Sequence, residues 1–214
     1  MSLDAVTYDP NAANRYLSDL NSPLPSLAVN EAQLAGVRIQ PTIGPHVAAL
    51  LDALIRLLRP VRILEIGTSF GYSAAVMGRA AQSCGGTVLT CEINPRLAEA
   101  ARTNLRALGL HEVVTVHQGD AQALVKELAP PFGLILQDGD KMKYLPMLDS
   151  LVALLPPGGV LISDDVLFPV MNLPESARHW GDAMHEYNLA LRTRLDLHTI
   201  WLPLGDGVAV SIKQ

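Results

Sequence analysis

Three aspartates stand where two apolar segments of the chain end. Asp138 follows residues 134–137, and Asp164 and Asp165 follow residues 160–163. Ligands of open α/β sheets bind beyond the carboxyl ends of the strands, so side chains that follow two neighbouring strands meet there. Carboxylates packed together repel one another, and an oxygen-only set favours a hard divalent cation over zinc. The alternative is that these aspartates only cap the turns or helices that follow them.

A glycine turn forms a second candidate site. Residues 61–66 are mostly apolar and β-branched, as expected for a buried parallel strand. Gly67 and Gly71 then allow the backbone to turn sharply and to approach a ligand closely. The dinucleotide fingerprint G-x-G-x-x-G needs glycine where Ser69 and Tyr72 stand, so this turn argues against a nicotinamide enzyme.

An acidic residue in register with the turn strengthens the second site. Glu92 ends the predicted strand 87–92 and lies 21 residues beyond Gly71. Folds of this kind use a carboxylate at that place to hold ribose hydroxyls. We therefore expect the turn and Glu92 to bind one ribose-containing cofactor. The alternative is an ordinary strand, turn and helix without a ligand.

The elements that position both sites alternate along the chain. A helix is expected from Pro45 until Pro60 ends it, because proline is favoured in the first turn of a helix. Repeated β-α units then predict a parallel sheet with right-handed crossovers. The expected strands are 61–66, 87–92, 113–117, 133–137 and 160–163, and the expected helices are 73–82, 95–108, 121–129, 143–155 and 175–191.

The end of the chain breaks this alternation. Strands are expected at 195–202 and 208–213, and the glycine loop between them indicates a hairpin, so one of the two runs antiparallel. We predict an α/β, Rossmann-like, doubly wound fold with a mostly parallel seven-stranded sheet and a C-terminal antiparallel hairpin. Residues 41–214 would form this domain, and residues 1–40 a polar N-terminal arm with a short helix at 11–20.

Composition narrows the class of protein. The 214 residues are 49% hydrophobic and 17% charged, which indicates a well-buried globular domain. The net charge of −5 argues against nucleic acid or an anionic membrane as the main partner. The chain has no apolar run of about 18 residues and no basic, apolar leader. Its two cysteines, Cys84 in an expected loop and Cys91 in an expected strand, do not make a disulfide framework, so we expect a soluble cytoplasmic protein.

The glycine turn resembles a motif of a known family. The pattern Glu65-x-Gly67-x-x-x-Gly71, followed by Glu92, resembles motif I of the class I S-adenosylmethionine-dependent methyltransferases. This resemblance implies that S-adenosylmethionine is the cofactor. The residues implied to bind it are Ile43, Glu65, Gly67, Thr68, Ser69, Ser73, Glu92, Ile93, Asp120, Ala121, Asp138 and Asp140.

Later motifs resemble one group within that family. Residues 138–144 resemble the Asp-x-x-Lys-x-x-Tyr element of the metal-dependent O-methyltransferases, the catechol and caffeoyl-CoA O-methyltransferase group. Residues 163–167 are similar to its Asp-Asn metal element, residues 202–207 to its closing hairpin, and Asn188 fits its last helix. The resemblance covers roughly residues 40–214 and joins several motifs in order.

What this group does sets the expected function. The resemblance implies methyl transfer to a hydroxyl of a small, catechol-like aromatic acceptor, assisted by a divalent cation: Mg²⁺ first, with Ca²⁺ or Mn²⁺ as alternatives. Asp138, Asp164 and Asp165 would bind the metal, with Asp138 and Lys141 as the catalytic residues. Lys141 would be the general base, which requires a nearby cation to depress its pKa. The plainer interpretation is a surface lysine paired with Asp138 or Asp140.

Assembly is also expected from the resemblance, because relatives often pair. The polar arm carries Tyr8, Tyr16, Leu17 and Leu20, which could dock on a second copy, so a homodimer is expected. Three competing interpretations remain open. They are a metal-independent methyltransferase of the same fold acting on nitrogen or carbon, a nicotinamide enzyme, and a non-catalytic cofactor binder.

Two departures from the group bear on the acceptor. Asp165 stands where the group has asparagine, which makes the site more negative by one charge. An extra carboxylate would tighten metal binding while weakening the Lewis acidity felt by a substrate oxygen. The segment 168–175 is also short where relatives carry longer substrate-facing insertions. Both departures leave the identity of the acceptor more open than that of the cofactor.

Overall fold

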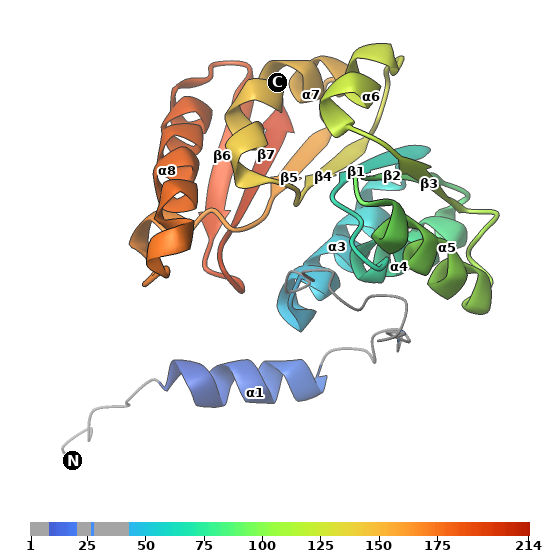
Figure 1. Ribbon diagram of the computed structural model, residues 1–214, viewed down its shortest axis with the longest axis horizontal. Coiled ribbons are helices and arrows are strands. Elements are labelled where there is room, and N and C mark those ends of the chain that lie inside the picture. Colours follow the sequence, from blue (N-terminus) through green and yellow to red (C-terminus); the bar gives the residue numbers. More distant parts are fainter. Residues whose placement is uncertain (1–8, 21–26, 28–42) are drawn as a thin grey trace.

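A seven-stranded sheet with helices on both faces forms the body of the computed structural model, which describes residues 9–20, 27 and 43–214 (Figure 1). The strand order is β3-β2-β1-β4-β5-β7-β6. All pairs are parallel except those of β7, which runs antiparallel to both β5 and β6. The strands are β1 (Arg62–Ile66), β2 (Thr87–Glu92), β3 (Val114–Gln118), β4 (Leu134–Gln137), β5 (Val160–Ser163), β6 (Leu197–Leu202) and β7 (Val208–Lys213). The predicted fold class is confirmed.

The helices form two layers, one on each face of the sheet, as Figure 1 shows. On one face lie α3 (Pro45–Leu58), α4 (Tyr72–Cys84) and α5 (Pro95–Ala107). On the other lie α6 (Ala121–Glu127), α7 (Tyr144–Leu154) and α8 (Arg178–Thr193). Each face has its own apolar core, because alternate residues of every strand point to opposite sides.

Local sequence explains where the helices begin and end. Pro45 starts α3, and Arg59 ends it in a left-handed conformation. The Asn94 side chain accepts a hydrogen bond from the Arg96 amide at the start of α5, and Asp120 accepts one from the Gln122 amide at the start of α6.

The structure refines three predictions. The helix expected at 143–155 begins earlier as the 3₁₀ turn η1 (Lys141–Lys143), because Asp140 accepts a hydrogen bond from the Met142 amide. The helix expected at 175–191 likewise begins as η3 (Glu175–Ala177) and continues as α8 to Thr193. Cys84, expected in a loop, lies instead in the last turn of α4. Both cysteines are free, and Cys91 is buried in β2 as predicted.

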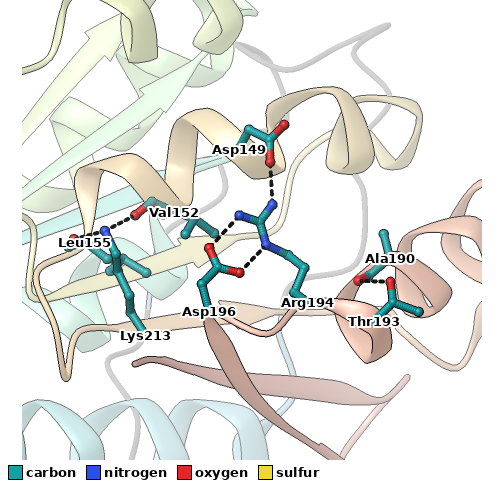
Figure 2. Close-up of polar contacts among 8 residues, drawn as sticks. All are labelled: Asp149, Val152, Leu155, Ala190, Thr193, Arg194, Asp196 and Lys213. Carbon is teal, nitrogen blue, oxygen red and sulfur yellow. Dashed lines mark hydrogen bonds and ion pairs between the residues drawn. The ribbon is translucent and has the colours of Figure 1, made fainter.

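Two charged side chains, Arg194 and Lys213, connect the C-terminal segment of the chain to α7 (Figure 2). Arg194, just beyond α8, pairs with Asp149 of α7 and with Asp196, which lies 2.7 Å away. Lys213 at the end of β7 donates to the carbonyl oxygens of Val152 (2.9 Å) and Leu155 (2.7 Å). An ammonium group is favourable at these carbonyls, because the C-terminal end of a helix carries partial negative charge.

The N-terminal arm is described only in part. Helix α1 (Pro10–Leu20) agrees with the helix predicted at 11–20, and Ser18 Oγ lies 3.5 Å from His46 Nε2 of α3. Residues 1–8, 21–26 and 28–42 lie outside the described residues, so the predicted division into arm and domain stays a prediction. No helix in the described ranges is both long and apolar enough to cross a lipid bilayer.

Candidate active site

A cavity of about 970 Å³ runs along the carboxyl ends of the strands, as the fold predicts. We name the two halves of this cavity after the ligands predicted for them. The cofactor half lies beyond β1, β2 and β3 and is lined by Gly67, Thr68, Ser69, Glu92 and Asp120. The acceptor half lies beyond β4 and β5, at the β6–β7 hairpin and the start of α8, and is lined by Asp138, Lys141, Asp164, Asp165, Phe168, Trp180 and Asp206. One continuous cavity therefore joins the two sites that the sequence predicts separately.

The glycine turn brings the two halves into contact. Gly67 has a φ of +98°, and a Cβ atom at this position would lie 2.3 Å from the carbonyl oxygen of Asp138. Only glycine allows both this conformation and this close approach. The turn after β1 thus packs directly on the backbone that carries the first predicted metal ligand.

Glu92 is held by main-chain groups in the cofactor half. Its Oε2 accepts a hydrogen bond from the Ser69 amide (2.8 Å), and its Oε1 accepts one from the Asn94 amide (2.9 Å). The side chain is 8% exposed and lines the cavity. A fixed carboxylate with free lone pairs at this place is suited to bind vicinal hydroxyls, as the ribose prediction requires.

Glu65 lies behind the cavity wall. It is fully buried and does not itself line the cavity, unlike the other predicted cofactor residues. Burial raises the pKa of Glu65 to about 8, with its neighbours Ser73 and Thr90 limiting the rise. Within the described chain neither carboxylate oxygen of Glu65 has a hydrogen-bond partner.

The unpartnered buried oxygens gather at this site. In the described part of the chain, four buried side-chain oxygens have no hydrogen-bond partner: both of Glu65, Ser69 Oγ and Asp164 Oδ1. Buried polar atoms are normally satisfied, and such exceptions call for a group that is not part of the chain. Ser69 and Asp164 line the two halves of the cavity, so each half offers an oxygen to a polar ligand.

Lys141 is the centre of the acceptor half. Its Nζ lies 3.1 Å from Asp138 Oδ1 and 2.6 Å from Asp165 Oδ2, and it donates to Tyr144 Oη at 3.2 Å. The side chain is 5% exposed, so Lys141 is not a surface lysine, although it pairs with Asp138 as the plainer interpretation expected. The pairing also joins loops that follow two different strands, β4 and β5, which are neighbours as predicted.

Burial and charge shift the pKa values in this cluster. Burial raises the pKa of Asp138 to about 6 against the lowering effect of Lys141. Burial, together with Asp138 and Asp165, raises the pKa of Asp164 to about 8. Burial alone would lower the pKa of Lys141. The pKa nevertheless lies well above its usual value, because the neighbouring groups of Tyr144, Asp138 and Asp165 raise it. The sequence argument expects a depressed pKa for Lys141, and with only these partners present the direction is the opposite.

The predicted metal ligands are near one another but not converged. Among the described residues, no three His, Cys, Asp or Glu side chains are grouped so that they could hold a metal ion. The ammonium group of Lys141 lies between Asp138 and Asp165 instead. The donor set nevertheless has the chemistry that a hard cation needs, since it is all carboxylate oxygen and includes the unpartnered Asp164 Oδ1. Metal binding by Asp138, Asp164 and Asp165 stays a prediction.

An apolar wall, which was not predicted, lies in the acceptor half. The rings of Phe168 and Trp180 lie 6.3 Å apart at an interplanar angle of 23°, and Leu173 lines the cavity beside them. Parallel aromatic faces next to the acidic cluster suit a flat, apolar ligand. Segment 168–175 was singled out from the sequence as the place of substrate-facing insertions in relatives, but no role was assigned to Phe168, Leu173 or Trp180.

Most of the predicted residues meet at this cavity. Its lining includes all of the predicted site residues except Glu65, namely Ile43, Gly67, Thr68, Ser69, Ser73, Glu92, Ile93, Asp120, Ala121, Asp138, Asp140, Lys141, Asp164 and Asp165. Lining a cavity is a matter of position, so the role of each residue stays a prediction.

Known proteins are similar to this chain in sequence and in fold. Residues 20–214 match the family model described as O-methyltransferase. A catechol O-methyltransferase from Niastella koreensis is 31% identical over 183 residues, which are 81% of this chain and 82% of the relative. A caffeoyl-CoA O-methyltransferase from Eucalyptus globulus is 26% identical, over 75% of this chain and 70% of the relative. The crystal structure of an O-methyltransferase from Bacillus cereus in complex with SAH has a TM-score of 0.78 at 25% identity and covers 95% of this chain and 97% of that one.

Proposed function

The chain belongs to the O-methyltransferase family, and on that premise we propose that it moves the methyl group of S-adenosylmethionine to one hydroxyl of a small catechol-like acceptor, assisted by a divalent cation. The relatives are named for catechol and for caffeoyl-CoA, and both compounds carry adjacent phenolic hydroxyls. The observation that carries the proposal is the position of Lys141 between Asp138 and Asp165, in a cavity that continues to Glu92.

The residues of the cofactor half would orient the methyl donor. S-adenosylmethionine supplies an electrophilic methyl group, so this chain needs only to place an oxygen in line with it. Glu92 would bind the ribose hydroxyls, Ile93 would pack on the adenine, and Asp120 with Ala121 would lie at the adenine edge. Gly67, Thr68, Ser69 and Ser73 would lie along the methionine part, with the buried Glu65 behind the cavity wall.

The residues of the acceptor half would prepare the hydroxyl. A phenol with a pKa near 10 is mostly protonated at pH 7, so its proton must be removed. A divalent cation held by Asp138, Asp164 and Asp165 would supply positive charge that lowers the pKa of that hydroxyl. Phe168 and Trp180 would cover the aromatic ring and exclude water.

Lys141 would take the proton only after its own pairing changes. An ammonium that is paired with two carboxylates keeps its proton, because both partners raise its pKa. Charge neutralisation of Asp138 and Asp165 by a cation would remove that effect and lower the pKa of Lys141. With Asp138 and Asp165 engaged by that cation, Lys141 Nζ would be available to accept the proton of the acceptor hydroxyl. Lys141 thus links occupation of the acidic cluster to the availability of a base.

One observation favours a second candidate function. Because Lys141 already neutralises part of the acidic cluster, methyl transfer without a metal is the alternative. In that case the Lys141 ammonium would stabilise the charge on the acceptor oxygen, and Asp138, Asp164 and Asp165 would only hold the lysine. The acceptor would then have to lose its proton to water or to another base.

The test is turnover of a catechol panel with S-adenosylmethionine, followed by mass spectrometry of the methylated product. We expect turnover that needs Mg²⁺ or Mn²⁺ and stops in excess chelator. Asp138→Ala should abolish turnover while cofactor binding persists. Asp182→Ala on the exposed face of α8 is the matched control and should behave as wild type. Turnover that persists in chelator supports the metal-free alternative, and cofactor binding without turnover of any catechol places the acceptor in another class.

Assembly and location stay predictions. On α1 the side chains of Tyr16, Leu17 and Leu20 are 65%, 48% and 64% exposed, which leaves an apolar face for a second copy of the chain. Tyr8, the fourth residue of the expected contact, lies outside the described residues. The homodimer, the cytoplasmic location and the absence of nucleic-acid or membrane partners are expectations from composition and resemblance.

A further inference from the structure

Tyr187 and Asn188 are consecutive residues of α8. They form hydrogen bonds with residues that are adjacent in sequence to the three predicted metal ligands. The Tyr187 hydroxyl donates to Gln137 Oε1 (3.0 Å) and lies 2.7 Å from Ser163 Oγ. Gln137 and Ser163 immediately precede Asp138 and Asp164. Asn188 Nδ2 donates to the carbonyl oxygen of Val166 (2.8 Å), the residue that follows Asp165.

These two residues do not touch a ligand themselves. Tyr187 is fully buried, and its ring packs edge-on against that of Tyr144, with centroids 5.2 Å apart. Neither Tyr187 nor Asn188 is among the residues that line the cavity. Any effect they have on the reaction must therefore pass through the segments that they hold.

The segment held by Asn188 needs such support. Asp165 has a φ of +63°, a left-handed conformation that costs free energy for any residue except glycine and persists where surrounding contacts impose it. The Val166 amide donates to the Gly207 carbonyl (3.1 Å), and the Leu167 amide donates to the Asp206 carbonyl (2.9 Å). The bond from Asn188 completes a set that fixes the backbone directly after Asp165.

Helix α8 is itself anchored. Trp201 of β6 donates through its Nε1 to Asn188 Oδ1 (3.2 Å), which fixes the orientation of the Asn188 amide. Beyond the C-terminal end of the helix, Arg194 pairs with Asp149 and Asp196, as Figure 2 shows. Tyr187 and Asn188 thus belong to a helix that is held to α7 on one side and to the edge strand β6 on the other.

We propose that Tyr187 and Asn188 are positioning residues that hold Asp138, Asp164 and Asp165 in the arrangement required for cation binding and turnover. The inference rests on the proposed function and deepens it. Partners behind metal ligands typically change metal affinity or activity by about 10–100-fold when they are removed. Because Asn188 acts on strained backbone, its loss should have the larger effect.

The experiment compares Asn188→Ala, Asn188→Asp and Tyr187→Phe with Leu189→Ala, a control at an exposed position of the same helix. Asn188→Asp keeps the shape and the acceptor for Trp201 but cannot donate to Val166. The measurements are Mn²⁺ affinity by electron paramagnetic resonance, cofactor affinity by calorimetry, kcat and KM for a catechol, and Tm. If the two residues have a positioning role, only Mn²⁺ affinity and the kinetic constants kcat and KM should change.

We expect both Asn188 variants to weaken Mn²⁺ binding and to lower kcat by about 10-fold or more, with cofactor affinity unchanged. Tyr187→Phe should show the same pattern more weakly, and Leu189→Ala should behave as wild type.

A lower Tm with unchanged Mn²⁺ affinity and kcat would overturn the proposal, as would an equal loss of cofactor affinity. If wild type methylates no catechol, the proposed function fails and Mn²⁺ affinity alone decides. If wild type binds no Mn²⁺, the proposal is overturned whether or not the protein turns over.

Discussion

The two halves of the cavity are built differently. In the cofactor half, Glu92 accepts hydrogen bonds from two main-chain amides of nearby turns, and Asp120 caps the helix that it precedes. In the acceptor half, Asp138 and Asp165 are held by the side chain of Lys141, and Asp164 Oδ1 is held by nothing in the described chain. Main-chain donors are fixed by the fold, whereas a lysine side chain can change partner. The carboxylate of the first half is therefore fixed by the backbone, whereas the side-chain pairing in the second half can change even though its backbone is held.

After Asp138→Ala, which should abolish turnover, Lys141→Met should have the largest effect, and it acts on the acceptor half alone. Removing the base should lower turnover by about 10²–10⁴-fold, with the smallest deficit at high pH, where a phenol ionises unaided. Cofactor affinity, measured by calorimetry, should not change. Lys126→Met on the exposed face of α6 is the control. Turnover within about threefold of wild type at neutral pH would show that Lys141 is not the base.

Glu92→Ala should act on the cofactor half alone. Loss of charged hydrogen bonds to ribose should weaken S-adenosylmethionine binding by about 1–3 kcal/mol, as measured by calorimetry. The acceptor half should keep its affinity for Mn²⁺, and Glu99→Ala on the surface of α5 should change neither. Unchanged cofactor affinity would refute the ribose assignment, and parallel loss of Mn²⁺ affinity would break the separation of the two halves.

The free energy of unfolding should depend on pH, because carboxylates are buried close together in the acceptor half. Asp138 and Asp164 have pKa values of about 6 and about 8, above the ordinary value near 4, so the folded protein binds more protons than the unfolded chain in this range. Stability without ligands should therefore fall as pH rises from about 5 to 8. Glu65, behind the cofactor half, has a pKa of about 8, so its ionisation should also lower the stability as pH rises.

Thermal unfolding with and without Mg²⁺ checks this dependence. Mg²⁺ should restore Tm most at pH 8, where within this range the carboxylates are most ionised. Asp164→Asn should make Tm depend less on pH and should reduce the Mg²⁺ effect. A Tm that rises steadily from pH 5 to 8 without ligands would contradict the raised pKa values.

Asp165→Asn should have the smallest effect. Asparagine adopts the left-handed conformation at least as readily as aspartate and keeps one oxygen ligand. Losing one of the two carboxylates beside Lys141 would also let its pKa fall toward that of a base. Turnover should stay within about threefold of wild type or rise, and a fall of about 100-fold would mean that the charge of Asp165 is essential.

Local patterns predicted much of this molecule. The glycine turn, Glu92 and the strand-end aspartates lie where the β-α alternation places them, because a parallel sheet brings all carboxyl ends of its strands to one edge. The pairing of Lys141 with Asp165 was not predicted, because it depends on the left-handed backbone of Asp165 and on contacts with the β6–β7 hairpin. Phe168 and Trp180 were missed for a similar reason, since an irregular segment and a helix face have no period that marks a cavity wall.

The position of β7 has a consequence for the growing chain. This strand is the last of the described strands to be synthesised, yet it lies between β5 and β6. During translation the N-terminal strands can pair first, so β5 is left as an open edge until Val208–Lys213 arrive. Such an edge is a template for pairing with another nascent chain. The cofactor half can thus assemble on the ribosome, whereas closure of the acceptor half awaits the end of this segment and exposes the molecule to aggregation until then.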